Sequence, residues 1–221
     1  MDTTSTHLPL QQILMRLTLL PVLAASLIGL VRFRHLPPNL RYLAAGVGFF
    51  LLPMGLLGLL LLVLHRNNLF LMPIYTLGEL GILAAVYHRT LHSVFFTRLM
   101  LWLTAGFASY AVVDLLAATM LTRFRPGQQV LQSVLILAMV GFYFRQLLNE
   151  LQVKRLWQEP MFWVSAGLCI YFLGYLQIAL FSNYLLRYSR QLNMNIWAVH
   201  SLLFIVLYLC YCRALWVSPK S

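Results

Sequence analysis

The stretch that decides the class of this protein is YLAAGVGFFLLPMGLLGLLLLVL, from Tyr42 to Leu64. It contains no charged side chain, and a helix needs about 20 mostly apolar residues to cross the hydrocarbon core of a bilayer. The polar sequence that follows it, from His65 to Asn68, is typical of a tight turn. The stretch therefore predicts a transmembrane helix that ends at a short connection.

The rest of the chain has the same character. Hydrophobic residues make up 61% of the 221 residues and charged residues only 10%, whereas a soluble domain is roughly a quarter charged and about half apolar. No segment alternates between apolar and polar residues as a membrane strand does. The composition excludes a soluble enzyme and predicts an all-α, polytopic membrane protein.

Charged residues and prolines divide the chain into apolar blocks long enough to span a bilayer. The seven blocks are residues 13–31, 42–64, 69–87, 99–121, 130–148, 161–186 and 196–215. The first block lacks the basic leader and the cleavage site of a signal peptide, so we expect it to be retained. We predict a seven-transmembrane-helix bundle that forms a single domain over residues 1–221.

The basic residues predict the orientation of this bundle. The chain has 16 Lys and Arg against 5 Asp and Glu, a net charge of +11. Ten of the 16 follow the first, third, fifth and seventh blocks, and six lie on the other side. The positive-inside rule then places the N-terminus outside and the C-terminus in the cytoplasm. We interpret the charge as a topology signal, so we expect a lipid bilayer as partner and no nucleic acid.

Several kinds of cofactor chemistry find no support in the sequence. The three cysteines, Cys169, Cys210 and Cys212, lie inside predicted helices and lack a metal-binding spacing. We therefore expect them to pack in the core as small apolar residues. The only lysines, Lys154 and Lys220, lie outside the blocks, which excludes a retinal Schiff base. No hydrolase elbow, HExxH motif or phosphate-binding loop is present. We therefore predict neither a metal nor a cofactor.

Two carboxylates inside the predicted helices are the leading functional candidates. Glu79 lies in the middle of the third block and Asp114 in the fourth. An ionisable side chain at the bilayer centre costs about 2.5–3.5 kcal/mol on insertion scales, so such residues are functional candidates by default. Each follows a tyrosine by one helical turn, Tyr75 and Tyr110 respectively, whose phenol can hydrogen-bond the acid.

Polar and aromatic side chains of the last two blocks complete the predicted ligand site. They are Tyr171, Gln177, Asn183, Trp197 and His200. With the N-terminus outside, most of these residues and Asp114 fall in the outer half of the membrane, with Glu79 near the midplane. We expect them to line one cavity open to the outside. The alternative is structural: the two protonated acids would hold neighbouring helices together, and His200 would be a buried packing residue without a role in binding.

A family resemblance appears in the same region. Phe162-Trp163, Gly167, Tyr171-Phe172 and Gly174, followed by Trp197-x-x-His200-Ser201, resemble small bacterial seven-helix proteins that accompany, or are fused to, histidine kinases. The resemblance implies a membrane sensory module in a bacterial inner membrane, with a cytoplasmic C-terminus. The chain ends at Ser221 without a kinase region, so we expect it to signal through a separate protein such as a histidine kinase, with a homodimer left open.

The sequence therefore favours a receptor-like or accessory protein that binds a small or lipidic ligand in the outer half. The basic segment from Arg145 to Arg155 would contact the cytoplasmic partner. One alternative is an intramembrane lipid hydrolase that uses Asp114, Glu79 and His200 as catalytic residues. Others are a proton-coupled carrier, in which Glu79 moves the proton, and a scaffold subunit without a ligand.

Overall fold

The computed structural model describes residues 14, 17–64, 66, 68, 70–91, 94–116, 126–150, 156–188 and 190–217. Within helices, the side chains at 62, 94–97, 115–116, 126, 150, 181–188 and 190–194 lie outside this description. All regular secondary structure in the described residues is helical, which confirms the all-α prediction.

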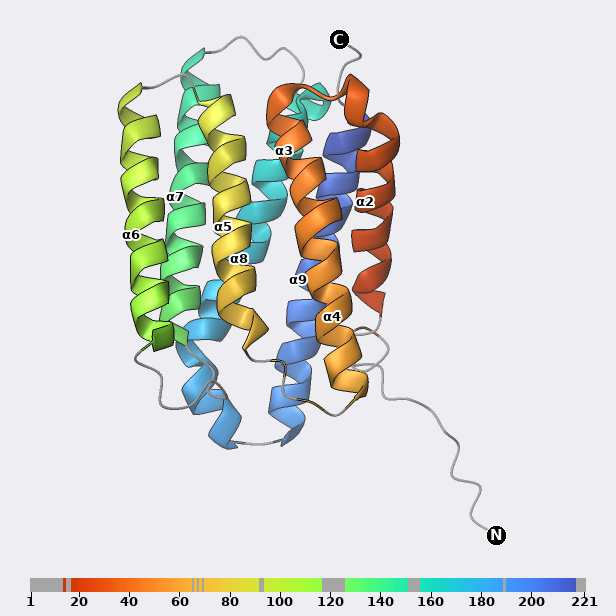
Figure 1. The fold of residues 1–221 in the computed structure, drawn as a ribbon, viewed down its shortest axis with the longest axis vertical. Coiled ribbons are helices and arrows are strands. Elements are labelled where there is room, and N and C mark those ends of the chain that lie inside the picture. Colours follow the sequence, from red (N-terminus) through yellow and green to blue (C-terminus); the bar gives the residue numbers. More distant parts are fainter. Residues whose placement is uncertain are drawn as a thin grey trace.

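The helices follow one another with short connections. In chain order they are α2 (Leu19–Arg32), η1 (Phe33–His35), α3 (Pro38–Gly46), η2 (Val47–Leu51), α4 (Leu52–Val63), α5 (Leu71–Thr90), α6 (Val94–Leu116), α7 (Pro126–Glu150), η3 (Leu156–Gln158), α8 (Pro160–Tyr188) and α9 (Arg190–Val217). The segments α3, η2 and α4 are contiguous and form one rod, and the long helices run alternately up and down (Figure 1).

Each predicted block coincides with a helix over most of its described length, but several helices begin earlier than predicted. The second begins at Pro38 and the fifth at Pro126, each several residues before its apolar block. Proline fits the first turn of a helix, because its φ is already helical and the missing N–H would have no partner there. Residues 13, 15, 16, 69 and 117–121 of the predicted blocks lie outside the described part.

Four of the described helices are long and apolar enough to cross a membrane: Pro38–Leu61, Gly127–Asn149, Pro160–Leu180 and Asn195–Val217. Large apolar side chains also cover the outside of the bundle. Val31, Phe49 and Trp102 are each more than 70% exposed, and an apolar surface of this extent suits a lipid environment better than water. These observations support a membrane protein with transmembrane helices.

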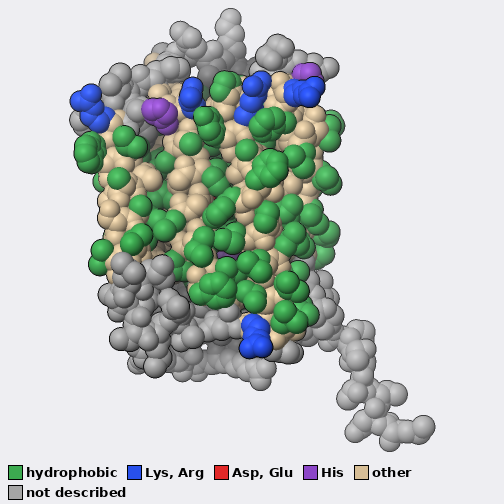
Figure 2. Space-filling view, viewed as in Figure 1, with side chains coloured by type: hydrophobic (Ala, Val, Ile, Leu, Met, Phe, Trp, Pro, Cys, Tyr) green, Lys and Arg blue, Asp and Glu red, His purple; other side chains and the backbone are tan. Residues whose placement is uncertain are grey.

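The Arg side chains of the described residues lie near the ends of the helices. Figure 2 shows Arg side chains along the end of the bundle that holds the C-terminus in Figure 1, with apolar surface over the length of the helices. Arg32 ends α2, and its guanidinium donates to the carbonyl oxygen of Leu215 near the end of α9 at 3.1 Å. Arg213 stacks 5.8 Å from the Trp163 ring. We call this the basic end of the bundle.

Helix α8 packs closely against α9. A Cβ added at Gly167 would lie 2.7 Å from the Cβ of Cys210, so only glycine allows this approach. On the other side, the Phe50 ring occupies the space beside Gly78 where a side chain would point. Phe50 belongs to η2, a π-helical turn, and such turns locally widen a helix. The two glycines thus bring α9 against α8 and the α3–α4 rod against α5.

Candidate functional site

Glu79 lies at the centre of the bundle. Its side chain on α5 is only 6% exposed. The Gln132 amide Nε2 of α7 donates to Glu79 Oε2 at 2.8 Å, and it also lies 3.3 Å from the carbonyl oxygen of Thr76, one turn earlier on α5. A buried carboxyl group needs such a donor, since an unpartnered one would carry its full desolvation cost. Gln132 therefore anchors Glu79 to α7.

Tyrosine side chains surround this pair. Tyr75, Tyr171, Tyr175, Tyr208 and Tyr211 lie within electrostatic range of the Glu79 carboxyl group and come from α5, α8 and α9. We call these five residues the tyrosine cluster. The hydroxyls of Tyr75 and Tyr208 hydrogen-bond each other, and the rings of Tyr171 and Tyr175 stack with centroids 5.6 Å apart. The cluster supplies several phenol groups around one carboxyl group.

His200 joins the tyrosine cluster from α9. Its Nε2 lies 3.1 Å from the Tyr171 hydroxyl, where either atom can be the donor. Its ring centroid lies 5.2 Å from that of Tyr175 and 5.5 Å from that of Trp197. A polar connection therefore runs from His200 through Tyr171 to the surroundings of Glu79.

A groove leads to the cluster from the side of the bundle. It has a volume of about 690 Å³ and lies between α2, α4, α5 and α9. Aliphatic residues such as Val22, Leu51 and Leu59 line its walls, and Tyr75 and Tyr208 contribute the polar groups nearest to Glu79. We call it the α2/α4 groove. None of its lining residues is charged, so its shape and polarity suit an apolar chain.

Asp114 has a different environment. The amide Nε2 of Gln128 donates to Asp114 Oδ2 at 2.7 Å, and Gln128 lies one turn before Gln132 on α7. Asp114 is only half-buried, and the nearby Tyr110 is 41% exposed. Neither residue lines the α2/α4 groove. The two acids thus occupy separate sites joined by consecutive turns of α7.

Of the other residues predicted for the ligand site, some lie near Glu79 and others lie elsewhere. Tyr75, Tyr171, His200 and Trp197 gather around or next to the site of Glu79. Gln177 is exposed on the face of α8 opposite the buried Tyr171 and Tyr175. A helix turns by about 100° per residue, so Gln177, two residues after Tyr175, points about 200° away from it. The side chain of Asn183 lies outside the described residues.

The most important partner that sequence reasoning missed is Gln132. Gln128 and Gln132 are four residues apart and thus share one face of an otherwise apolar helix. That spacing was a readable signal for two interhelical hydrogen bonds, although it does not say which acids the glutamines contact. Tyr211 was also missed, because a tyrosine in an apolar helix is most often a packing residue.

Within the described residues, no three His, Cys, Asp or Glu side chains lie close enough to hold a metal ion. Comparisons with protein-family models, with curated proteins and with solved structures find no match for this chain. The geometry of the site therefore carries the functional argument.

Proposed function

We propose that this protein is a receptor-like membrane protein that binds a small amphiphilic ligand and reports its presence to a separate cytoplasmic partner. The observation that carries the proposal is the combination at Glu79: a buried, hydrogen-bonded carboxyl group, a cluster of tyrosines, and a groove of about 690 Å³ that ends on two of those tyrosines. Ligand sites typically combine such apolar walls with a few convergent polar groups.

The polarity of the groove indicates the class of ligand. The walls are aliphatic, so a hydrocarbon chain gains free energy by entering them. The polar end offers tyrosine hydroxyls next to Glu79 and no basic side chain among the lining residues. An uncharged or cationic head group fits these groups, whereas an anionic one would meet a carboxylate without a counter-ion. A long-chain alcohol is the simplest probe of this class.

The proposed signal passes along α9. This helix carries His200 and Tyr208 at the site and Arg213 at the basic end. The proposal places the bundle in a bacterial inner membrane with seven spans, the N-terminus outside and the basic end in the cytoplasm, which the distribution of Lys and Arg supports. The resemblance to kinase-associated seven-helix proteins supports a histidine kinase as partner. Of the segment from Arg145 to Arg155, Arg145 is exposed on α7 and residues 151–155 lie outside the described part.

Photolabelling tests the ligand site. Purified protein in detergent is irradiated with a diazirine-bearing hexadecanol, and labelled peptides are located by mass spectrometry. We expect labels on α2, α4 and α9. Gly55 lines the groove and a side chain there meets open space, so Gly55→Leu should fill the groove and abolish labelling without a packing conflict.

Gly141→Leu is the matched control, since Gly141 is also a helical glycine facing open space but lies outside the groove. Labelling that persists in Gly55→Leu, or that is absent from the unmodified protein, contradicts the proposed site. The second result is the one that a scaffold subunit without a ligand predicts.

An intramembrane lipid hydrolase is the second candidate. It is favoured by the tyrosines beside Glu79, two of which line the groove and one of which contacts His200, because a carboxylate with nearby phenol groups can act as a general base. Incubation of purified protein with lysophospholipids and ether lipids, followed by mass spectrometry of the products, tests it. Product that forms with the unmodified protein and disappears in Glu79→Gln would establish the enzyme.

A further inference from the structure

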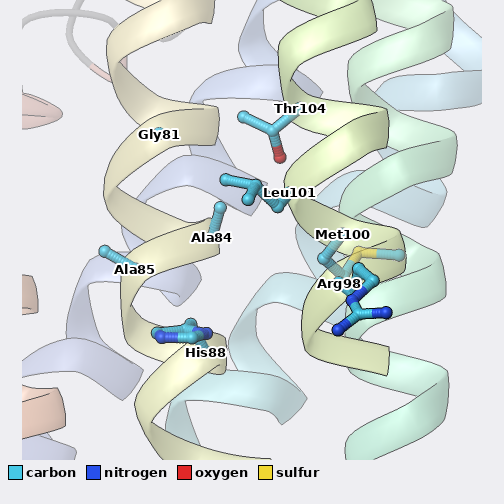
Figure 3. A pocket seen from close by; sticks show the side chains of 8 residues that line it. All are labelled: Gly81, Ala84, Ala85, His88, Arg98, Met100, Leu101 and Thr104. Carbon is cyan, nitrogen blue, oxygen red and sulfur yellow. The ribbon is translucent and has the colours of Figure 1, made fainter. Parts of the chain in front are cut away.

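A second cavity lies on the other side of α5. It occupies the space between α5 and α6, has a volume of about 600 Å³, and takes no part in the site around Glu79. Small residues on α5, Gly81, Ala84 and Ala85, form one wall and Leu101 of α6 forms part of the other (Figure 3). We call this cavity the α5/α6 cleft.

The position of α6 leaves the cleft open to the surroundings of the bundle. This helix packs against α5 and α7 at one edge of the fold. Leu101 is 69% exposed, and Gly81 is exposed as well. A side chain added at Gly81 would meet nothing within 4 Å. A membrane lipid can therefore reach the cleft sideways, with its acyl chain parallel to the two helices.

The charges of the cleft lie at one end. His88 of α5 and Arg98 of α6 line it near the basic end of the bundle, while its other lining residues are apolar except for Thr104. Long basic side chains at the end of a membrane helix extend toward lipid phosphates. An apolar cleft with an arginine at the membrane surface is complementary to a lipid that has an anionic head group and a hydrocarbon tail.

Thr104 adds a polar group inside the cleft. Its Oγ1 is buried and has no hydrogen-bond partner within the described part of the chain. Figure 3 shows this hydroxyl directed toward the space between the helices. Thr104 lies six residues from Arg98 on α6, about 9 Å along the helix axis. Below its phosphate, a glycerophospholipid has ester carbonyls, which are acceptors for such a hydroxyl.

We propose that the α5/α6 cleft binds one anionic glycerophospholipid, with its phosphate at Arg98 and His88 and an acyl chain against Gly81, Ala84 and Ala85. In the proposed orientation this lipid belongs to the cytoplasmic leaflet, where anionic lipids are enriched. The binding itself depends on the cleft and not on the ligand site at Glu79.

Titration of the delipidated full chain in detergent tests the head-group contact. Phosphatidylglycerol and phosphatidylcholine with identical acyl chains are compared by native mass spectrometry. Phosphatidylglycerol should bind about fivefold more tightly, as expected for one basic contact worth about 1 kcal/mol. Arg98→Gln should abolish this preference. Arg34→Gln, at an exposed residue of the same end but outside the cleft, should leave it unchanged.

A second pair of variants tests the acyl-chain contact. Gly81→Leu fills the cleft and should weaken binding of both lipids about tenfold, the loss expected when two methylene groups are displaced. Gly141→Leu again serves as control. Arg98 is exposed, so its substitution tests the proposal even if Gly81→Leu does not fold.

Four results would overturn the proposal. Equal binding of the two lipids to the unmodified protein excludes an anionic head-group site. Unchanged binding in a folded Gly81→Leu variant places the lipid elsewhere. Displacement of the lipid by glycerol 3-phosphate alone shows a site for a free anion instead. A changed oligomeric state of Arg98→Gln in light scattering shows that Arg98 contacts a second copy of the chain.

Discussion

Glu79 and Asp114 occupy similar positions in the sequence but different positions in the bundle. Each follows a tyrosine by four residues, and each accepts a hydrogen bond from a glutamine of α7. Glu79 is buried and faces the tyrosine cluster, whereas Asp114 is half-buried.

The difference comes from the helices that carry the two acids. Helix α5 contacts the α3–α4 rod, α6 and α7, so a side chain in its middle is enclosed on several sides. Helix α6 lies at the edge of the fold and contacts α5 and α7. The same local motif therefore forms a buried polar centre on one helix and a half-exposed contact on its neighbour.

The largest expected effect is that of Gln132→Leu. This change leaves the buried Glu79 carboxyl group without its amide donor, so the free energy of unfolding should fall by about 2 kcal/mol. Unfolding in mixed detergent micelles measures it. The double variant Glu79→Leu with Gln132→Leu should recover part of the loss, because both polar groups are then gone. A double variant less stable than the single one contradicts this account.

Tyr208→Phe should have an intermediate effect. The change removes one hydroxyl of the hydrogen bond between Tyr75 and Tyr208 at about constant volume, so the free energy of unfolding should fall by about 1 kcal/mol. Tyr110→Phe is the matched control beside the other acid, and it should change stability little because Tyr110 is 41% exposed. Equal losses in the two variants would show that the tyrosine cluster is no different from the surface of α6.

The smallest expected effect is that of Gln128→Leu. The hydrogen bond joins the buried Gln128 of α7 to the half-buried Asp114 of α6, and interhelical hydrogen bonds in a membrane protein contribute about 0.6 kcal/mol on average. The same unfolding measurement applies. A loss as large as that of Gln132→Leu would remove the distinction between the two acids and would make α7 the common support of both.

Much of the fold could be predicted from local sequence. Apolar blocks and charged breaks located the helices, because the bilayer imposes both their length and their polarity. The starts at Pro38 and Pro126 were placed too late, since the apolar block was used as the boundary although proline marks the first turn. The number of spans and the orientation stay predictions.

The site was only partly predictable. Glu79, Tyr75, Tyr171 and His200 were found because polar groups in apolar helices are rare. Their association with Gln132 could not be found, because a helix pattern shows which residues share a face but not which helix that face meets. For the same reason the sequence placed Asp114 and Gln177 in a cavity with Glu79, whereas in the structure they lie at other positions.

The sequence by itself determined that this is a helical membrane protein, where its helices run and which polar residues lie within them. These properties depend on each segment alone and on the cost of burying charge in hydrocarbon. The tertiary structure decided which acid is enclosed, which residues donate to it, and where the two cavities open. Those properties depend on which helices lie next to each other. Close contacts, such as that of Gly167 with Cys210, select the neighbours, and the sequence of a single helix does not encode them.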